Sequence, residues 1–207
     1  MKELYKDENS KYCYENSDIL INKMNIKDKQ ILTKLEAKIT GAKLLGLRQK
    51  GITGNFDKEH YIQIHSYLFE DIYPFAGEFR KENISKGEFR FASWEYIEEE
   101  LNRLLNKLKK ENYLDNLDKH QLAQKLAYYL SELNVLHPFR EGNGRANREF
   151  IRQLALKNDY LLNLKKVSPK ETLRASIESI VDTTKLENII EECLEKTTTW
   201  KYCKMLV

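Results

Sequence analysis

Breaks in regular structure are rare along this chain, since three prolines and eight glycines are spread through 207 residues. Between them, apolar residues recur at the three- and four-residue spacing of amphipathic helices. The pattern predicts helices over residues 28–47, 57–72, 94–112, 118–136, 145–157, from 168 onward and over 183–196. On the first of these, the residues expected to face inward are Ile31, Leu32, Leu35, Ile39, Ala42 and Leu45. No repeat or linker separates the helices, so we expect one compact all-α domain over residues 1–207.

One stretch, residues 77–93, carries strand-forming residues instead. Phe79, Ile84, Phe89 and Phe91 favour strands. Ser85-Lys86-Gly87 suits a turn between two short arms. We therefore expect a small surface β-hairpin on the helical domain.

Composition and charge exclude several classes of protein. The 35 Lys+Arg and 32 Asp+Glu are interspersed and give a net charge of +3, which does not suggest binding to nucleic acid or to a membrane surface. No apolar run approaches the ~18 residues of a membrane span, and nothing marks the chain for export. The three cysteines, Cys13, Cys193 and Cys203, lack the spacing of a disulfide frame or a zinc site. These features predict a cytoplasmic protein with reduced thiols.

The segment from His137 to Arg148, HPFREGNGRANR, holds more reactive groups than any other part of the chain. The unperturbed pKa of a histidine lies near neutrality, so His137 can take a proton from a hydroxyl group. Gly142, Asn143 and Gly144 form a turn whose N–H groups can point toward one anion, and a helix follows directly. A glycine-rich turn that leads into a helix N-terminus is suited to binding phosphate.

The charged residues of the same segment fit a polyphosphate. Glu141 supplies a hard oxygen ligand, which suits Mg²⁺ held by one carboxylate, water and substrate phosphates. Arg145 and Arg148 lie three residues apart on the first turn of the helix, so both can reach phosphate oxygens from one face. The segment thus indicates a phosphate-transfer site.

The segment fills every fixed position of HPFx[D/E]GNGRxxR, and it resembles the signature of the Fic family. Fic proteins are mostly adenylyltransferases that move AMP from ATP to a protein hydroxyl of Tyr, Thr or Ser, with release of pyrophosphate. The resemblance covers roughly residues 27–196. It implies that His137 is the base and that Glu141 binds Mg²⁺ or Mn²⁺. It also implies that the turn through Gly144 holds the α- and β-phosphates, with Arg145 and Arg148 on the outer phosphates.

The resemblance also gives the hairpin a function. In Fic proteins a β-hairpin called the flap covers the nucleotide and binds the main chain of the target protein by strand addition. Here the flap would span about residues 83–92. Ile84 and Lys86 would then lie next to the nucleotide.

A second motif follows the signature. Thr183-Thr184-Lys185-Leu186-Glu187-Asn188 resembles the inhibitory motif [S/T]xxxE[G/N] of class III Fic proteins, with Thr183, Glu187 and Asn188 at its fixed positions. The resemblance implies that Glu187 pairs with Arg148 and blocks productive binding of ATP. From spacing alone, Thr184 and Glu187 also fit an ordinary capping box at a helix start.

Three functions follow from these motifs. The first is an adenylyltransferase that Glu187 inhibits. The second is a hydrolase in which Glu187 is catalytic and orients water to remove AMP from a modified protein. The third is a nucleotide-sensing module, which His137 argues against because binding needs no base. Self-modification and assembly into a homo-oligomer stay open, and the target protein is not predicted.

Overall fold

The structure is a computed structural model that describes residues 10–197. Its α-helices are α1 (Lys29–Lys50), α2 (Lys58–Phe69), α3 (Ile97–Lys110), α4 (Lys119–Leu136), α5 (Asn143–Lys157), α6 (Pro169–Glu178) and α7 (Thr184–Cys193). Short 3-10 turns lie at Trp94–Tyr96, Asn112–Leu114 and Leu164–Lys166. The expected mostly helical fold is confirmed.

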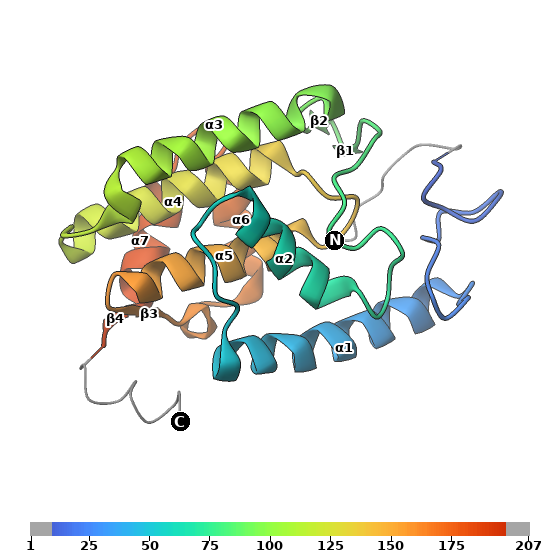
Figure 1. Ribbon diagram of the computed structural model, residues 1–207, viewed down its shortest axis with the longest axis horizontal. Coiled ribbons are helices and arrows are strands. Elements are labelled where there is room, and N and C mark those ends of the chain that lie inside the picture. The colour runs from blue at the N-terminus through green and yellow to red at the C-terminus, as the bar shows by residue number, and fades with distance from the viewer. Residues whose placement is uncertain (1–9, 198–207) are drawn as a thin grey trace.

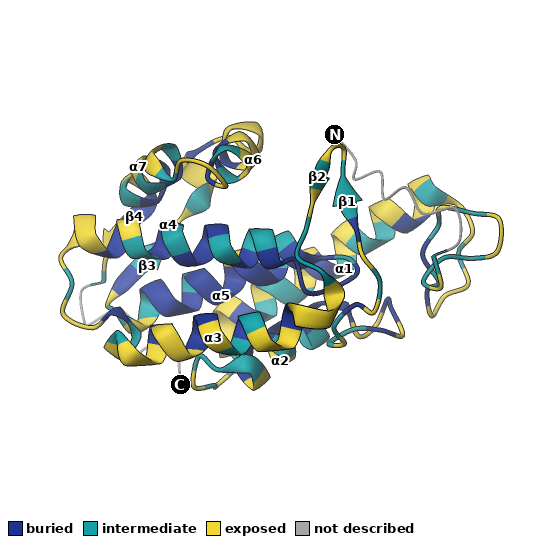
Figure 2. Ribbon diagram, turned by 90° about the horizontal axis from the view of Figure 1, so that it is seen from above, coloured by how far each residue is buried: buried dark blue, intermediate teal, exposed yellow. Residues whose placement is uncertain are grey.

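Helices α4 and α5 form the centre of the domain (Figure 1). α7 packs along α4, α2 packs on α5, and α3 runs beside α4. The side of α5 that the sequence placed inward is fully buried at Phe150, Ile151, Leu154 and Ala155. Figure 2 shows this buried layer in the middle, with the hairpin and the α6–α7 pair rising from the same side of it.

Local sequence explains where most helices begin. The side chains of Asp28, Asp57 and Asp118 accept hydrogen bonds from the first backbone N–H groups of α1, α2 and α4. At α6, Ser168 caps the helix and Pro169 occupies its first turn. These capping residues were visible in the sequence, so the predicted starts lie within a few residues of the observed ones.

The inward face of α1 was predicted correctly only in part: Leu32 is buried and Leu35 and Ile39 are half-buried. Ile31 and Leu45 are 56% and 58% exposed, whereas Thr40 is buried. α1 lies at the edge of the domain and contacts α2 (Figure 1), so only a narrow stripe of it is covered. Periodicity shows that a helix is amphipathic, but it does not show how much of the apolar side a neighbour covers.

Two antiparallel strand pairs complete the fold. The hairpin consists of β1 (Ser85–Lys86) and β2 (Phe89–Arg90), with Ser85 opposite Arg90. The turn therefore lies at residues 87–88, and Ser85 and Lys86 are in a strand, not in the turn as predicted. β3 (Tyr160–Leu162) pairs with β4 (Leu194–Lys196). This second pair was not predicted. Because of it, α7 ends at Cys193 and not at residue 196, where the helix was predicted to end.

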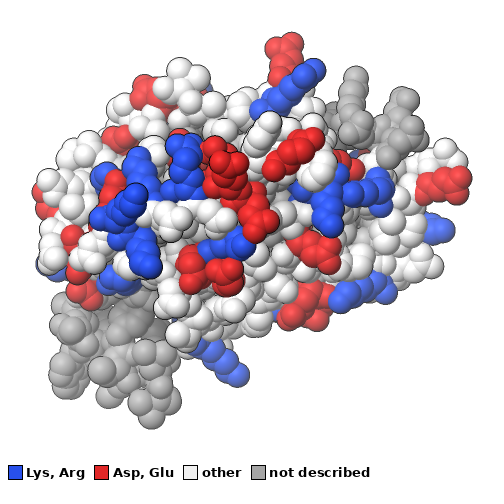
Figure 3. Space-filling model, turned by 45° about the horizontal axis from the view of Figure 1, so that its top comes forward, with Lys and Arg blue, Asp and Glu red and all other residues white. Residues whose placement is uncertain are grey.

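Further expectations concern cysteines, membranes and charge. Cys13 and Cys193 are free thiols, and Cys203 lies outside the described residues. Within residues 10–197, no helix has the length and apolar character to cross a membrane. Both signs of charge are mixed on the face shown in Figure 3.

Candidate active site

His137 ends α4 and begins the loop that leads to α5. Its backbone is left-handed, with φ 46° and ψ 59°. Its Nδ1 lies 3.1 Å from the carbonyl oxygen of Asn134. A carbonyl can only accept, so the hydrogen of the neutral imidazole is on Nδ1, and the lone pair is on Nε2. This tautomer suits a base that removes a proton through Nε2.

A chain of side chains holds this arrangement from two other helices. Asn147 of α5 donates to Oδ1 of Asn134 at 2.9 Å. Tyr61 of α2 in turn donates its hydroxyl to Asn147. Burial raises the pKa of Tyr61, so its phenol stays a donor at every physiological pH. Neither residue was predicted from the sequence, because Asn147 occupies a variable position of the motif and Tyr61 lies outside it.

Arg80 joins His137 to the base of the hairpin. Its guanidinium is buried and donates to the carbonyl oxygens of His137 at 2.8 Å, of Glu82 at 2.7 Å and of Ala92. Glu82 and Ala92 flank the two arms of the hairpin. The ring of Phe91 also stacks on the imidazole of His137, with 3.9 Å between centroids. The hairpin and the candidate base are thus tied into one unit.

Two residues fix the loop between His137 and α5. The side chain of Asn143 accepts from the N–H of Phe139 at 2.8 Å and donates to the carbonyl of Phe139 at 2.7 Å. Gly142 has a φ of 81°, and a Cβ there would lie 2.2 Å from the ring of Phe69. Only glycine satisfies both the backbone angle and this close contact.

The start of α5 has unused hydrogen-bond donors. Gly142 offers no side-chain cap. Within residues 10–197, the N–H groups of Asn143 and Gly144 have no protein acceptor. A Cβ at Gly144 would lie 3.1 Å from Nη1 of Arg148, so the guanidinium lies directly beside this turn. Unused N–H groups, the positive end of a helix and an arginine together form a binding site for an anion.

The two motif arginines have different surroundings. Arg148 is exposed, and it has no ion pair among the residues that the structure describes. Surrounding protein and the nearby charge of Arg145 lower the pKa of Arg148, which remains a cation. Arg145 instead contacts carboxylates at 2.7 Å on Glu36 and at 3.4 Å on Glu141. Arg148 is therefore the arginine more accessible to a phosphate.

Glu141 is the candidate metal ligand. Its Oε1 accepts from the N–H of Gly142 at 2.8 Å, and its side chain is 23% exposed. No group of three or more His, Cys, Asp or Glu with metal-binding geometry occurs in residues 10–197. A single partly exposed carboxylate beside a phosphate site fits Mg²⁺, which keeps several waters and takes its other ligands from substrate phosphates.

His65 of α2 packs against the loop between His137 and α5. It is stacked on Phe139, with ring centroids 3.6 Å apart. Its Nδ1 accepts from the N–H of Gly77 at 3.0 Å, so its Nε2–H donates to the carbonyl of Glu141 at 2.8 Å. Burial lowers the pKa of His65 to about 3. The imidazole therefore stays neutral and holds Glu141 in place.

His65 predicts how stability depends on pH. The folded pKa, about 3, is below the ordinary value of 6.5, so between these values the unfolded chain binds a proton that the folded chain does not. The free energy of unfolding should therefore fall as pH decreases from 6.5, by ~1.4 kcal/mol per pH unit from this residue. Urea unfolding between pH 7 and pH 5 measures the slope. In His65→Gln, which has an acceptor and a donor but no titratable group, the slope should be shallower, and an equal slope would contradict this role.

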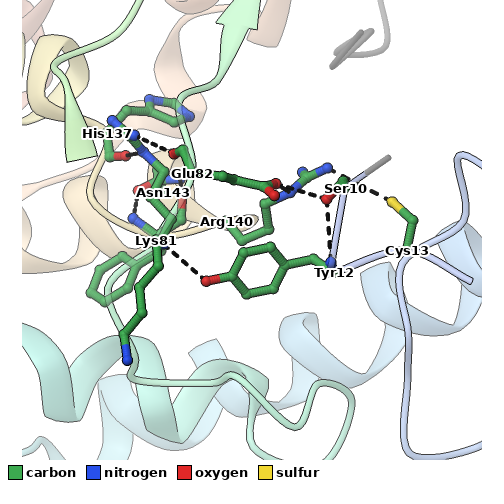
Figure 4. A network of polar contacts seen from close by, with 10 residues as sticks. Ser10, Tyr12, Cys13, Lys81, Glu82, His137, Arg140 and Asn143 are labelled. Atoms are coloured by element: carbon green, nitrogen blue, oxygen red, sulfur yellow. Dashed lines mark hydrogen bonds and ion pairs between the residues drawn. The ribbon is translucent and has the colours of Figure 1, made fainter. Parts of the chain in front are cut away.

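A buried ion pair connects the motif loop to the hairpin and to the N-terminal segment (Figure 4). Nε of Arg140 lies 2.7 Å from Oε1 of Glu82, and the hydroxyl of Ser10 donates to the same oxygen at 2.7 Å. The hydroxyl of Tyr12 accepts from the N–H of Lys81 at 3.0 Å. Segments from three parts of the chain thus hold the hairpin base against the motif loop.

Comparison with known proteins places this geometry in a family. The sequence pattern of the Fic/DOC family matches residues 55–155. Over 167 residues, the chain is 35% identical to the Probable protein adenylyltransferase Fic of Escherichia coli K12, and the match covers 79% of this chain and 80% of that protein. The chain belongs to the Fic/DOC family.

Other Fic proteins resemble it in sequence and in structure. It is 38% identical over 175 residues to protein adenylyltransferase VbhT of Bartonella schoenbuchensis, covering 84% of this chain and 37% of that relative. The N-terminal Fic domain of a VirB-translocated Bep effector from Bartonella quintana, solved with bound ADP, superposes with a TM-score of 0.83 at 26% identity. The superposition covers 90% of this chain and 95% of that domain.

The contact expected of Glu187 in a class III Fic protein is absent. Among the described residues, Glu187 makes no ion pair with Arg148, and its Oε1 accepts from the hydroxyl of Thr183 at 2.6 Å. Glu187 contributes to the raised pKa of His120, which is due first to Glu191. His120 is at the start of α4 and His137 at its end, ~25 Å apart at the helical rise. Glu191, one turn after Glu187 on α7, lies 2.8 Å from Nδ1 of His120, so this part of α7 lies near the start of α4, and the inhibitory role of Glu187 stays a prediction.

The capping box expected at α7 is also absent. The side chain of Thr184 donates to Asp182 and not to the helix. Thr183 precedes the helix without a side-chain cap, and Asn188 is exposed. In the flap, Ile84 is buried and its carbonyl accepts from Phe91, whereas Lys86 is half-buried in β1. The expected contacts of Ile84 and Lys86 with a nucleotide stay predictions.

Proposed function

We propose that this chain is a protein adenylyltransferase that moves AMP from ATP to a hydroxyl group of a protein. One observation carries the proposal: His137, held with its lone pair on Nε2, is six residues before a helix start whose N–H groups have no protein acceptor. The first feature supplies a base, and the second binds phosphate. The names of the relatives from Escherichia coli and Bartonella schoenbuchensis agree with this activity.

The chemistry follows from these positions. Nε2 of His137 takes the proton from the target hydroxyl, whose oxygen attacks the α-phosphorus of ATP. A new bond forms between this oxygen and the α-phosphorus, and the bond to the bridging oxygen of the β-phosphate breaks. The N–H groups of Asn143 and Gly144 stabilise the charge of the α- and β-phosphates, and Arg148 binds the outer phosphate. AMP stays on the protein and pyrophosphate leaves.

Glu141 is the residue that would bind Mg²⁺ or Mn²⁺, and the ion would neutralise charge on the leaving pyrophosphate. His65 and Gly142 hold the carboxylate of Glu141 in position through its backbone and through its oxygen. The flap, residues 83–92, would bind the target through the outer edges of its two short strands, which form a two-stranded sheet in the described part of the chain. Main-chain pairing of this kind positions a hydroxyl group of the target and depends little on the side chains of the target.

The reaction is tested with ATP labelled at different phosphates. Incubation of the enzyme with Mg²⁺ and α-labelled ATP should place label on protein, either on a target or on the enzyme itself. γ-Labelled ATP should place none and should release labelled pyrophosphate. Label from the γ-phosphate on protein would indicate a kinase, and no label from either ATP would contradict group transfer.

The position of Glu187 gives a further prediction. Its carboxylate accepts a hydrogen bond from Thr183 and, among the described residues, makes no ion pair with Arg148, so Glu187→Gly should change the rate of adenylylation less than twofold. Removal of AMP from modified protein should likewise not depend on it. The measurement compares the rates of AMP transfer and of AMP removal in the parent and the variant, each normalised to the amount of folded protein. A large rise in transfer would show that Glu187 inhibits in another conformation.

A further inference from the structure

Glu36 lies next to the proposed site but belongs to α1, outside the residues that match the family pattern. Its two carboxylate oxygens have different partners. Oε1 lies 2.7 Å from Nη2 of Arg145, and Oε2 accepts from the hydroxyl of Tyr73. Its side chain is 13% exposed. A carboxylate this well covered and this well bonded has one fixed orientation.

Arg145 is held between two carboxylates. Nη2 is closer to Glu36, at 2.7 Å, than to Glu141, at 3.4 Å. Nη1 lies 3.3 Å from the hydroxyl of Thr40, and the guanidinium covers the ring of Phe69 at 4.7 Å. Three of these contacts therefore draw the guanidinium toward α1 and α2. The remaining contact, with Glu141, is the longest of the three polar contacts, at 3.4 Å.

The relative strength of the contacts of Arg145 with Glu36 and Glu141 matters because Arg145 and a metal ion compete for the carboxylate of Glu141. If Glu36 lost its charge, Arg145 would keep Glu141 as its only carboxylate partner among the described residues. The partly buried guanidinium would then close onto Glu141, since an unpaired charge at this depth is unfavourable. A carboxylate in a close pair with arginine has fewer lone pairs and less charge to offer a cation.

We propose that Glu36 is a positioning residue of the metal site: it draws Arg145 toward α1, keeps the contact of Arg145 with Glu141 long and so leaves charge on the carboxylate of Glu141 for Mg²⁺. Tyr73, in the segment that follows α2, holds Glu36 for this role. The proposal rests on the proposed function, in which Glu141 binds the ion. It adds a residue from α1 to a metal site for which the sequence indicated Glu141 alone.

The test measures binding and not turnover. Calorimetry gives the dissociation constant of ADP once with excess MgCl₂ and once with excess EDTA, and the ratio of the two constants is the gain due to Mg²⁺. In Glu36→Ala the gain should fall roughly tenfold or more, as is common when a residue that orients a metal ligand is removed. Glu36→Gln, which keeps the size and one acceptor oxygen, should give a smaller fall.

Two controls separate this role from a general loss of structure. Lys43→Gln removes the ion pairs of the same helix with Glu70 and Asp71, and it should leave the gain unchanged even if α1 is loosened. Adding Arg145→Met to Glu36→Ala removes the competing cation, so the gain should return. An unchanged gain in Glu36→Ala, or no recovery in the double variant, would overturn the proposal. If the parent shows no gain, the metal role of Glu141 itself fails.

Discussion

His137→Ala should lower the rate of AMP transfer by ~10²–10⁴, the usual cost of losing a general base. The dissociation constant of ATP should stay close to that of the parent, because the proposed phosphate contacts come from Asn143, Gly144 and Arg148. Single-turnover transfer of α-labelled AMP and calorimetry with ATP measure the two effects separately. Burial of the imidazole beside Phe91 means that alanine also removes a stacking contact.

The matched control is His120→Ala. His120 is exposed and pairs with Glu191 at the other end of α4. This variant should transfer AMP at the parent rate. A comparison of melting temperatures shows whether any loss in His137→Ala comes from unfolding. Transfer at the parent rate by folded His137→Ala would remove His137 from the mechanism.

Gly142→Ala should disrupt both the fold of the loop and the binding of nucleotide. The new Cβ would lie 2.2 Å from the ring of Phe69, and alanine would have to keep a φ of 81°. The two effects together should lower the free energy of unfolding by about 3 kcal/mol. Because the same shift moves the N–H groups of Asn143 and Gly144, the affinity for ATP should fall at least tenfold at temperatures where the variant is folded.

Gly41→Ala is the control, because an alanine side chain at this position has room in the structure. A Cβ at Gly41 meets no atom within 4 Å, and the residue lies inside α1. The change should raise stability by about 0.5–1 kcal/mol, because alanine favours the helix. Urea unfolding and ATP calorimetry on both variants complete the test. Parent-like stability and affinity in Gly142→Ala would mean that the loop adapts and that the turn is not a fixed cradle.

Much of the candidate site could be predicted because it is local in the chain. His137, Glu141 and the turn at residues 142–144 lie within eight residues, so the end of one helix and the start of the next bring them together. The helices themselves begin at Asp28, Asp57, Asp118 and Ser168, and such caps act on the next few N–H groups only. Interactions between residues that lie so close together in the chain can be predicted from the sequence.

The sequence did not predict contacts between distant elements. The helix that carries Glu187 is confirmed, whereas the inhibitory role that the motif implies stays a prediction. Spacing in the sequence could not show where α7 lies along α4, and the structure places Glu191 of α7 at 2.8 Å from His120 at the start of α4. In the same way, the periodicity of α1 did not show that α2 covers only a stripe of it.

The sequence by itself determined the helices, the hairpin and the order of the reactive groups from His137 to Arg148, because each depends on neighbours in the chain. Only the tertiary structure decided which groups support them. Arg80 reaches His137 across 57 positions, and Thr40 reaches Arg145 across 105. Buried charges and amides need partners wherever the fold provides them, and no short-range pattern records that requirement. The packing of α1, α2 and the hairpin around one loop therefore set the tautomer of His137 and the position of Arg145.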